Sequence, residues 1–121
     1  MTEKYLNTVY EKIKTANVYD IAIKSPLEYA KNISKKLNNQ IYIKREDLQP
    51  VFSFKLRGAY NKIQKLKNLK YKKALIAASA GNHAQGVALS AKKLGIKAFI
   101  VMPKTTPKIK IDAVKSLKAN V

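Results

Sequence analysis

Residues 74–103 read ALIAASAGNHAQGVALSAKKLGIKAFIVMP, and this stretch decides the fold. Its first five residues form a continuous apolar run, which is typical of a strand buried on both faces. Residues 82–94 repeat alanine, valine and leucine at helical spacing, and Gly95 follows them as a C-terminal stop. Residues 98–101 form the next apolar strand. A strand, a helix and a strand in this order predict an α/β fold with an open parallel sheet flanked by helices.

The segments around this unit predict further helices and one more strand. We expect helices over residues 3–16, 25–38 and 53–69 and from Pro107 onward, and a strand over residues 41–43. Apolar residues three and four positions apart support the helices, and Ser25-Pro26 and Ser53 are typical starting residues. The second helix is expected to carry Leu27, Ala30, Ile33 and Leu37 on one face, and the third is expected to point Leu56, Ala59, Ile63 and Leu66 inward.

The composition is that of a soluble globular protein. Of the 121 residues, 46% are hydrophobic and 26% are charged, which suffices for one compact domain. The formal charge of +18 is a feature that nucleic-acid-binding proteins share. Yet Arg45 and Arg57 are the only arginines, and the lysines are scattered along the chain rather than gathered in one arm. We therefore expect no nucleic-acid partner.

The lysine-rich stretch KIQKLKNLKYKK, residues 62–73, has two interpretations. Its apolar residues recur at helical spacing, which favours the end of an amphipathic helix with solvated lysines. The alternative is a surface for nucleic acid or an anionic membrane.

Two residue types are scarce, and their scarcity excludes several classes of chemistry. The chain has no cysteine, so disulfides, thiol redox chemistry and thiolate metal sites are excluded. His83 is the only histidine, and we expect it to order a loop rather than to bind a metal. The N-terminal residues lack an apolar leader, and no run of about 18 apolar residues occurs. We expect a cytoplasmic protein without a metal or a membrane anchor.

One lysine occupies a position that favours chemistry. Residues 44–59 read KREDLQPVFSFKLRGA, with four charged residues first and Lys55 in the first turn of the following helix. A helix N-terminus carries partial positive charge, which disfavours an ammonium group and favours the free amine. Nucleophilic and Schiff-base chemistry require that free amine. Lys55 is therefore a candidate catalytic residue, and the alternative is a solvated surface lysine.

The loop after the first strand is a candidate anion site. Residues 79–86 read SAGNHAQG and join the strand to a helix through Gly81. Backbone N–H groups in such a loop, together with a helix N-terminus, favour binding of a carboxylate or a phosphate. The alternative is an ordinary turn, in which serine, glycine and asparagine are also common.

Three runs of sequence together resemble one enzyme family. The runs are Lys44-Arg45-Glu46-Asp47, the stretch SFKLRGA at residues 53–59 and Ser-Ala-Gly-Asn-His at residues 79–83. They are similar to motifs of the fold-type II pyridoxal-phosphate enzymes, and the resemblance implies an incomplete catalytic domain of the tryptophan-synthase-β-like fold. In that family the lysine holds pyridoxal 5'-phosphate as a Schiff base and removes the Cα proton of the substrate.

The resemblance also implies roles for particular residues. Lys55 would be the catalytic, cofactor-binding lysine, with Phe54 packed near the cofactor. The side chain of Asn82 would contact the ring hydroxyl of the cofactor, and the backbone amides of Ser79, Gly81 and Asn82 would bind the carboxylate of the substrate. No residue is assigned to a metal.

Within the family, two flanking stretches point to one activity. Gln49-Pro50-Val51 and Ala84-Gln85-Gly86-Val87 are most similar to biosynthetic threonine dehydratases. The resemblance implies dehydration and deamination of L-threonine, and also of L-serine, with 2-oxobutanoate and ammonia formed from threonine in the first step of isoleucine biosynthesis. Serine dehydratase and serine racemase remain alternatives, as do a non-catalytic relic of the enzyme and a basic nucleic-acid-binding protein.

The resemblance further predicts how the chain is organised. Residues 1–121 would be the N-terminal part of the catalytic domain, with entry helices and the cofactor lysine in roughly 1–57 and the start of a smaller α/β subdomain in 58–121. The glycine-rich phosphate loop of the family is expected beyond Val121, because no glycine-rich run occurs in this sequence. This fragment alone is expected to be inactive, and the full-length protein is expected to be a homotetramer.

Overall fold

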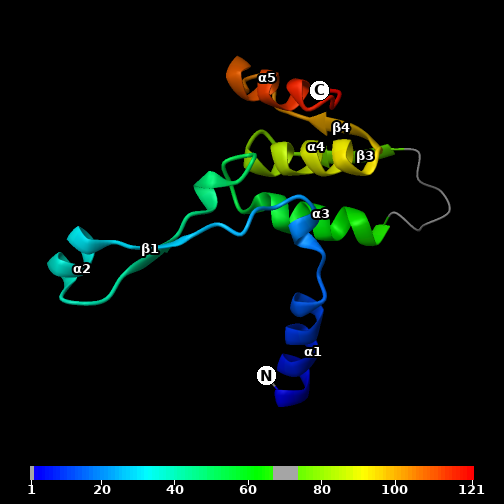
Figure 1. Ribbon diagram of the computed structural model, residues 1–121. Coiled ribbons are helices and arrows are strands. Elements are labelled where there is room, and N and C mark those ends of the chain that lie inside the picture. Colours follow the sequence, from blue (N-terminus) through cyan, green and yellow to red (C-terminus); the bar gives the residue numbers. More distant parts are fainter. Residues whose placement is uncertain (1, 67–73) are drawn as a thin grey trace.

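The computed structural model describes residues 2–66 and 74–121. Its helices and strands are α1 (Glu3–Lys14), β1 (Leu27–Tyr29), α2 (Lys31–Leu37), β2 (Tyr42–Lys44), α3 (Lys55–Leu66), β3 (Ala74–Ala78), α4 (Asn82–Leu94), β4 (Lys97–Val101) and α5 (Lys108–Ser116). Short 3₁₀ helices span Val18–Asp20 and Glu46–Leu48. In Figure 1, the elements from α3 to α5 form a body from which α1 and an arm made of β1, α2 and β2 project.

The strands β3 and β4 are parallel neighbours joined by α4, as the sequence predicts for an α/β fold. Ile76 pairs with Phe99 in the middle of the ladder. Phe99 also forms a parallel bridge with Asn120, and the amide of Ile100 donates to the Asn120 carbonyl at 2.7 Å. β4 therefore lies between β3 and the backbone at Asn120.

The core is built around α4, which contacts α3 as well as β3, β4 and α5. Its buried positions carry small side chains, so its backbone lies close to its neighbours. The core cluster consists of Ala59, Ile63, Ala84, Val87, Ala88, Ala91, Ala98, Ile100, Val114 and Ala119. The predicted inward face of the third helix is confirmed for Leu56, Ala59 and Ile63, which are buried, while Leu66 is half-buried.

The prediction that residues 74–78 are buried on both faces is wrong for the described structure. Leu75 and Ala77 face the core, whereas Ile76 is 76% exposed between the exposed Ala74 and Ala78. The aligned residues Phe99 and Val101 of β4 are exposed on the same side. The small apolar run fits either one or two covered faces, so hydrophobicity alone could not distinguish them.

The helix predicted over residues 25–38 is wrong in its first part. Leu27 to Tyr29 form β1, which pairs antiparallel with β2, and α2 begins only at Lys31. The backbone also bonds across the pair, from the amide of Ala30 to the Ile41 carbonyl at 2.9 Å. Cross-strand bonding overrides the helical spacing of Leu27 and Ala30. The predicted end of the helix is confirmed, because Asn38 adopts a left-handed conformation with φ of 45°.

The remaining predicted elements differ from the structure mainly at their ends. α1 ends at Lys14, β2 starts one residue later than predicted, and α5 starts directly after Pro107. α3 begins at Lys55 and is described to Leu66. The rest of the helix predicted to reach residue 69, and most of the lysine-rich stretch, lie outside the described residues.

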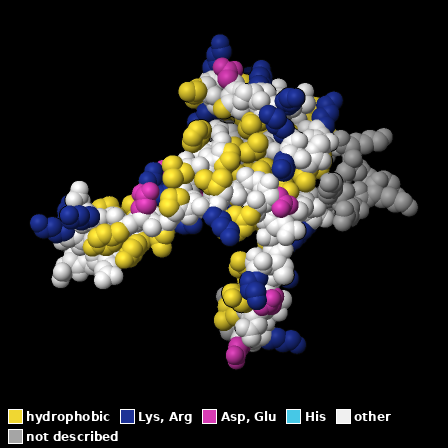
Figure 2. Space-filling view, viewed as in Figure 1, with side chains coloured by type: hydrophobic (Ala, Val, Ile, Leu, Met, Phe, Trp, Pro, Cys, Tyr) yellow, Lys and Arg dark blue, Asp and Glu magenta, His cyan; other side chains and the backbone are white. Residues whose placement is uncertain are grey.

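Large apolar side chains of α1 and of the arm are exposed, including Leu27, Ile33 and Leu37 of the apolar face predicted for the second helix. Figure 2 shows hydrophobic side chains along both projections, while lysine and arginine are scattered over this view. The exposed residues are Tyr5, Leu6, Tyr10 and Ile13 in α1, and Leu27, Tyr29, Ile33, Leu37, Tyr42 and Ile43 in the arm. No helix within residues 2–66 and 74–121 combines the length and the apolar character needed to cross a bilayer.

Candidate active site

Lys55 is the first residue of α3, and its side chain is exposed. The hydroxyl of Ser53 accepts a hydrogen bond from the Lys55 amide at 3.2 Å, which satisfies one of the free donors at the start of the helix. Nζ of Lys55 lies 4.7 Å from the centroid of the Phe54 ring. Phe54 is itself 57% exposed, so it is not a core aromatic. The amine and the ring form one accessible unit at the helix N-terminus.

The loop of residues 79–82 lies where the carboxyl ends of the parallel strands meet. The Ser79 amide donates to the Val101 carbonyl at 3.0 Å, so this amide is already engaged, contrary to the role expected for it, and the hydroxyl is the group of Ser79 that can still donate to a ligand. That hydroxyl also accepts from the Gly81 amide at 3.3 Å. Asn82 is exposed at the first position of α4. First-turn amides of a helix have no intrahelical acceptor, so this end of α4 favours an anion.

The two predicted loops are brought together by the packing of α3 on α4. Both helices begin at the same end of the body (Figure 1). Gly86 of α4 packs against the backbone at Lys55, because a Cβ built there would lie 3.2 Å from the Lys55 carbonyl oxygen. Asn82 is four residues before Gly86, which corresponds to a rise of about 6 Å along the helix. The N-terminal turn of α4 is therefore a near neighbour of the start of α3.

A largely buried polar network supports the start of α3, and the sequence patterns alone did not predict it. Arg57 donates to Glu46 through Nε at 2.8 Å and through Nη2 at 2.9 Å. The hydrogen bond from Arg57, with a smaller contribution from the Ser25 hydroxyl donating at 2.5 Å, lowers the pKa of Glu46 to about 2 although burial acts to raise it. The same pair raises the pKa of Arg57.

Gln49 extends this network to the backbone of Ile23. Its Oε1 accepts from the Ile23 amide at 3.0 Å, and its Nε2 donates to the Ile23 carbonyl at 2.9 Å. Lys44 donates through Nζ to the backbone carbonyl of Ser25. The residues of the 44–57 segment thus bind residues 23–25 through polar contacts. The one indication of this network in the sequence was the run of four charged residues at 44–47, because partly buried charges require oppositely charged or hydrogen-bonding partners.

Arg45 and Asp47, the other charged residues of this run, form an exposed cluster. Arg45 donates to Asp47 at 2.7 Å and to Glu28 of β1 at 2.6 Å. The bond to Asp47 and then the bond to Glu28 raise the pKa of Arg45, and the bond from Arg45 lowers the pKa of Asp47. The cluster ties the arm to the loop.

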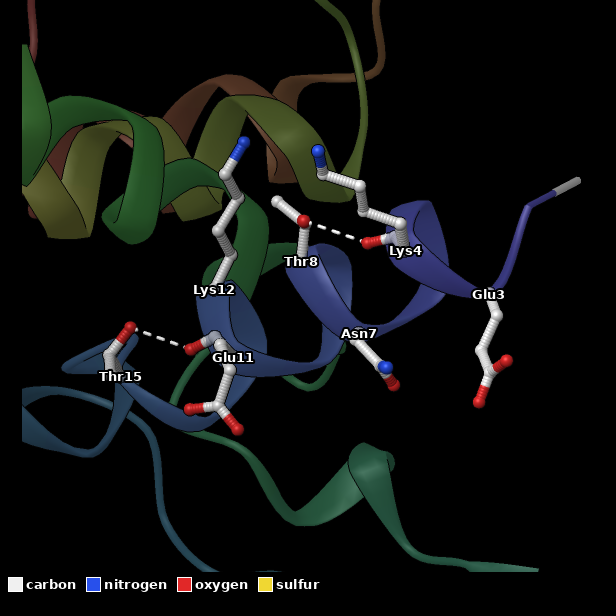
Figure 3. Close-up of a pocket in the computed structure, with 7 residues that line it drawn as sticks. All are labelled: Glu3, Lys4, Asn7, Thr8, Glu11, Lys12 and Thr15. Carbon is white, nitrogen blue, oxygen red and sulfur yellow. Dashed lines mark hydrogen bonds between the residues drawn. The ribbon is translucent and has the colours of Figure 1, made fainter.

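A shallow groove along α1 is separate from this site. Figure 3 shows its lining residues on one face of the helix, with Thr8 and Thr15 each donating to a carbonyl one turn earlier. All of its lining residues belong to α1 and to Thr15 just after it, and the predicted site residues are not among them. His83 is exposed and lines a small hollow with Gly58 and Ile76. Among the described residues, no group of three histidine, aspartate or glutamate side chains could hold a metal ion.

Comparison with known proteins connects this geometry to an enzyme family. Residues 18–121 match the family described as pyridoxal-phosphate dependent enzymes. The biosynthetic chloroplastic threonine dehydratase of Arabidopsis thaliana is 63% identical over 109 residues, which cover 90% of this chain and 18% of that protein. The chain spans about a fifth of the length of the curated relatives it matches.

Solved structures agree with the sequence relatives. The processed form of threonine deaminase isoform 2 from Solanum lycopersicum has a TM-score of 0.90 and 52% identity, over 100% of this chain and 33% of that one. Serine racemase from Dictyostelium discoideum has a TM-score of 0.85 and 31% identity, over 92% of this chain and 37% of that one. The predicted fold class and cofactor are thereby confirmed, and this chain belongs to the family of pyridoxal-phosphate dependent enzymes.

Proposed function

We propose that this chain supplies the cofactor lysine and the carboxylate-binding loop of a threonine dehydratase, which converts L-threonine to 2-oxobutanoate and ammonia. The observation that carries the proposal is the exposed amine of Lys55 at the start of α3, packed next to the N-terminal turn of α4 through Gly86. The higher identity to threonine dehydratases than to the serine racemase favours threonine as the substrate.

The residues present fit pyridoxal phosphate. The Lys55 amine is accessible for bonding to the aldehyde carbon of the cofactor, and the Phe54 ring beside it offers a flat apolar surface. Gly81 has nothing within 4 Å of the place where a Cβ would be, so the loop backbone is open to a ligand. When bound, the cofactor withdraws electrons from Cα of the substrate amino acid, which weakens the Cα–H bond.

The chain's own residues then have distinct tasks. Lys55 binds the cofactor and, once displaced by the substrate amine, accepts the Cα proton at Nζ. The Ser79 hydroxyl and the amides of Gly81 and Asn82 bind the substrate carboxylate, and the Asn82 side chain orients the cofactor ring. Because the Gly81 amide donates to Ser79, the carboxylate must share or replace this hydrogen bond.

The remaining parts of the proposal concern the whole protein. We assign roughly residues 1–57 to the entry helices and lysine segment, and 58–121 to the start of a smaller subdomain. The exposed apolar side chains of α1 and the arm support burial against further protein, in keeping with a homotetramer. Cytoplasmic location remains part of this proposal. Serine dehydratase and serine racemase activity are the alternatives for the same site.

A competition experiment tests the substrate class. The chain is incubated with pyridoxal phosphate and either L-threonine or D-threonine, fixed with borohydride and mapped by peptide mass spectrometry. Free pyridoxal phosphate is achiral and reacts equally with the amine of either enantiomer. A difference between the enantiomers therefore requires a chiral binding site on the protein. We expect L-threonine to lower the label at Lys55 more than D-threonine does. Equal loss with the two enantiomers, or stronger competition by L-serine than by L-threonine, would contradict threonine as the substrate.

A further inference from the structure

Gly86 occupies the point where α4 meets the start of α3. A Cβ at this position would lie 3.2 Å from three backbone atoms, namely the carbonyl carbon and oxygen of Lys55 and the amide nitrogen of Leu56. Such contacts are shorter than an ordinary van der Waals separation. Backbone atoms cannot rotate away as the end of a side chain can. Glycine is therefore the residue that allows this approach.

The surroundings leave α4 little room to move away. Leu56 and Ala84 are fully buried next to this contact. The hydroxyl of Ser90, which is also fully buried, donates to the Gly86 carbonyl at 2.6 Å and holds this turn of the helix. On its other sides α4 contacts β3, β4 and α5. An added methyl group must therefore displace the start of α3, by a few tenths of an ångström.

Gly58 offers a direct comparison within the same pair of helices. It lies inside α3, as Gly86 lies inside α4, and nothing is within 4 Å of its built Cβ. Alanine at either position gains the same intrinsic helix propensity. The two glycines therefore differ in the contact with Lys55 and Leu56.

We propose that Gly86 is a positioning residue for Lys55. By lacking a side chain, it lets the Lys55 backbone rest against α4 one turn after Asn82, and so sets the place of the lysine amine relative to the loop of residues 79–82. The inference rests on the proposed function of Lys55. Small errors in the placement of reacting groups reduce rates strongly, so a displaced start of α3 should slow the reaction of Lys55 with the cofactor.

The test compares Gly86→Ala with Gly58→Ala in the chain of 121 residues. The first readout is the backbone amide chemical shifts of Lys55 and Leu56, measured by NMR without cofactor. The second is the rate of borohydride-fixed pyridoxal-phosphate labelling at Lys55, divided by the rate at the exposed Lys108 of α5. We expect Gly86→Ala to move both amide signals and to lower the ratio about threefold to tenfold. We expect Gly58→Ala, with its own shifts confined to its helical neighbours, to leave the ratio unchanged.

The outcomes separate this inference from the proposed function. Unchanged amide signals and an unchanged ratio in Gly86→Ala would overturn the positioning role and leave the proposed function intact. Absence of selective label at Lys55 in the native chain would overturn the proposed function, and the amide signals alone would then decide the placement. If Gly86→Ala does not fold, the contact is tested in the native chain. We expect nuclear Overhauser effects between the Gly86 α-protons and the Leu56 amide proton, and their absence would overturn the inference.

Discussion

Arg57 binds Glu46 through two parallel hydrogen bonds, from Nε to Oε2 at 2.8 Å and from Nη2 to Oε1 at 2.9 Å. The two side chains are 23% and 17% exposed, so the pair is largely shielded from water. Arg57 is two residues after Lys55 in α3, and Glu46 belongs to the loop before it. The pair therefore fixes the loop to the first turns of the helix that carries the proposed catalytic lysine.

Removal of the charge on Glu46 should destabilise the fold. Glu46→Gln retains the shape of the side chain but leaves the Arg57 guanidinium without its anionic acceptor, and we expect a loss of about 2 kcal/mol in the free energy of unfolding. Asp47→Asn removes a charge from the exposed pair with Arg45 and should have a smaller effect. Urea denaturation of both variants measures this. An equal loss of stability in Glu46→Gln and Asp47→Asn would contradict a special structural role for the pair of Glu46 and Arg57.

The low pKa of Glu46 predicts a specific pH dependence. Its folded value of about 2 lies below the ordinary 4.5, because Arg57 donates to the charged form. The stabilisation is therefore complete above about pH 4.5 and is lost as the pH falls from there toward 2. The difference in free energy of unfolding between the native chain and Glu46→Gln should shrink over this range. A difference that stays constant from pH 7 to pH 2 would contradict this assignment.

Gln49 should matter through its bonds to the backbone of Ile23. It is only 1% exposed, and Gln49→Leu would leave the amide of Ile23 without its acceptor, while the Ile23 carbonyl would keep only the hydrogen bond from Nη2 of Arg57 at 3.2 Å. We expect a loss of about 2 kcal/mol, measured by thermal or urea unfolding. Gln40→Leu, at an exposed position before β2, serves as the control. If Gln49→Leu is as stable as this control, the side-chain bonds contribute little.

The α/β unit was predictable because its signal is local. The run of residues 74–78, the helical spacing after Asn82 and the stop at Gly95 are each visible in the sequence, and each lies where predicted. β1 was not predictable in this way, because Leu27 and Tyr29 become a strand only through pairing with residues of β2. Pairing with another strand determines the local structure here more strongly than helical spacing does, and the spacing of residues does not show which strand will pair.

The site shows the same division between local and long-range information. Lys55, Ser79, Gly81 and Asn82 could be proposed from motifs, since motifs are contiguous in the sequence. The bonds of Glu46 to Arg57 and of Gln49 to Ile23 span 11 and 26 positions, and the role of Gly86 depends on a backbone 30 residues away. Such relationships require the packed structure.

The open face of the β3–β4 sheet should tolerate polar substitution. Ile76 is 76% exposed and Ile100 on the neighbouring strand is 2% exposed. We expect Ile76→Thr to change the free energy of unfolding by no more than about 0.5 kcal/mol, because little apolar contact is lost. Ile100→Thr should cost about 3 kcal/mol, since it leaves a void and buries a hydroxyl. Similar costs at the two positions would show that the face of Ile76 is covered in solution.

The central claim is that Lys55 is the lysine that binds pyridoxal phosphate, and site-resolved borohydride trapping tests it most directly. The chain has 23 lysines (25 Lys+Arg less Arg45 and Arg57), so equal reactivity would put about one part in 23 of the label on each. Native chain, Lys55→Ala and the control Lys62→Ala are labelled and mapped side by side. The account predicts that Lys55 carries most of the label in the native chain and in Lys62→Ala, and that total label falls sharply in Lys55→Ala. Label spread evenly over the lysines, and unchanged by Lys55→Ala, would contradict it.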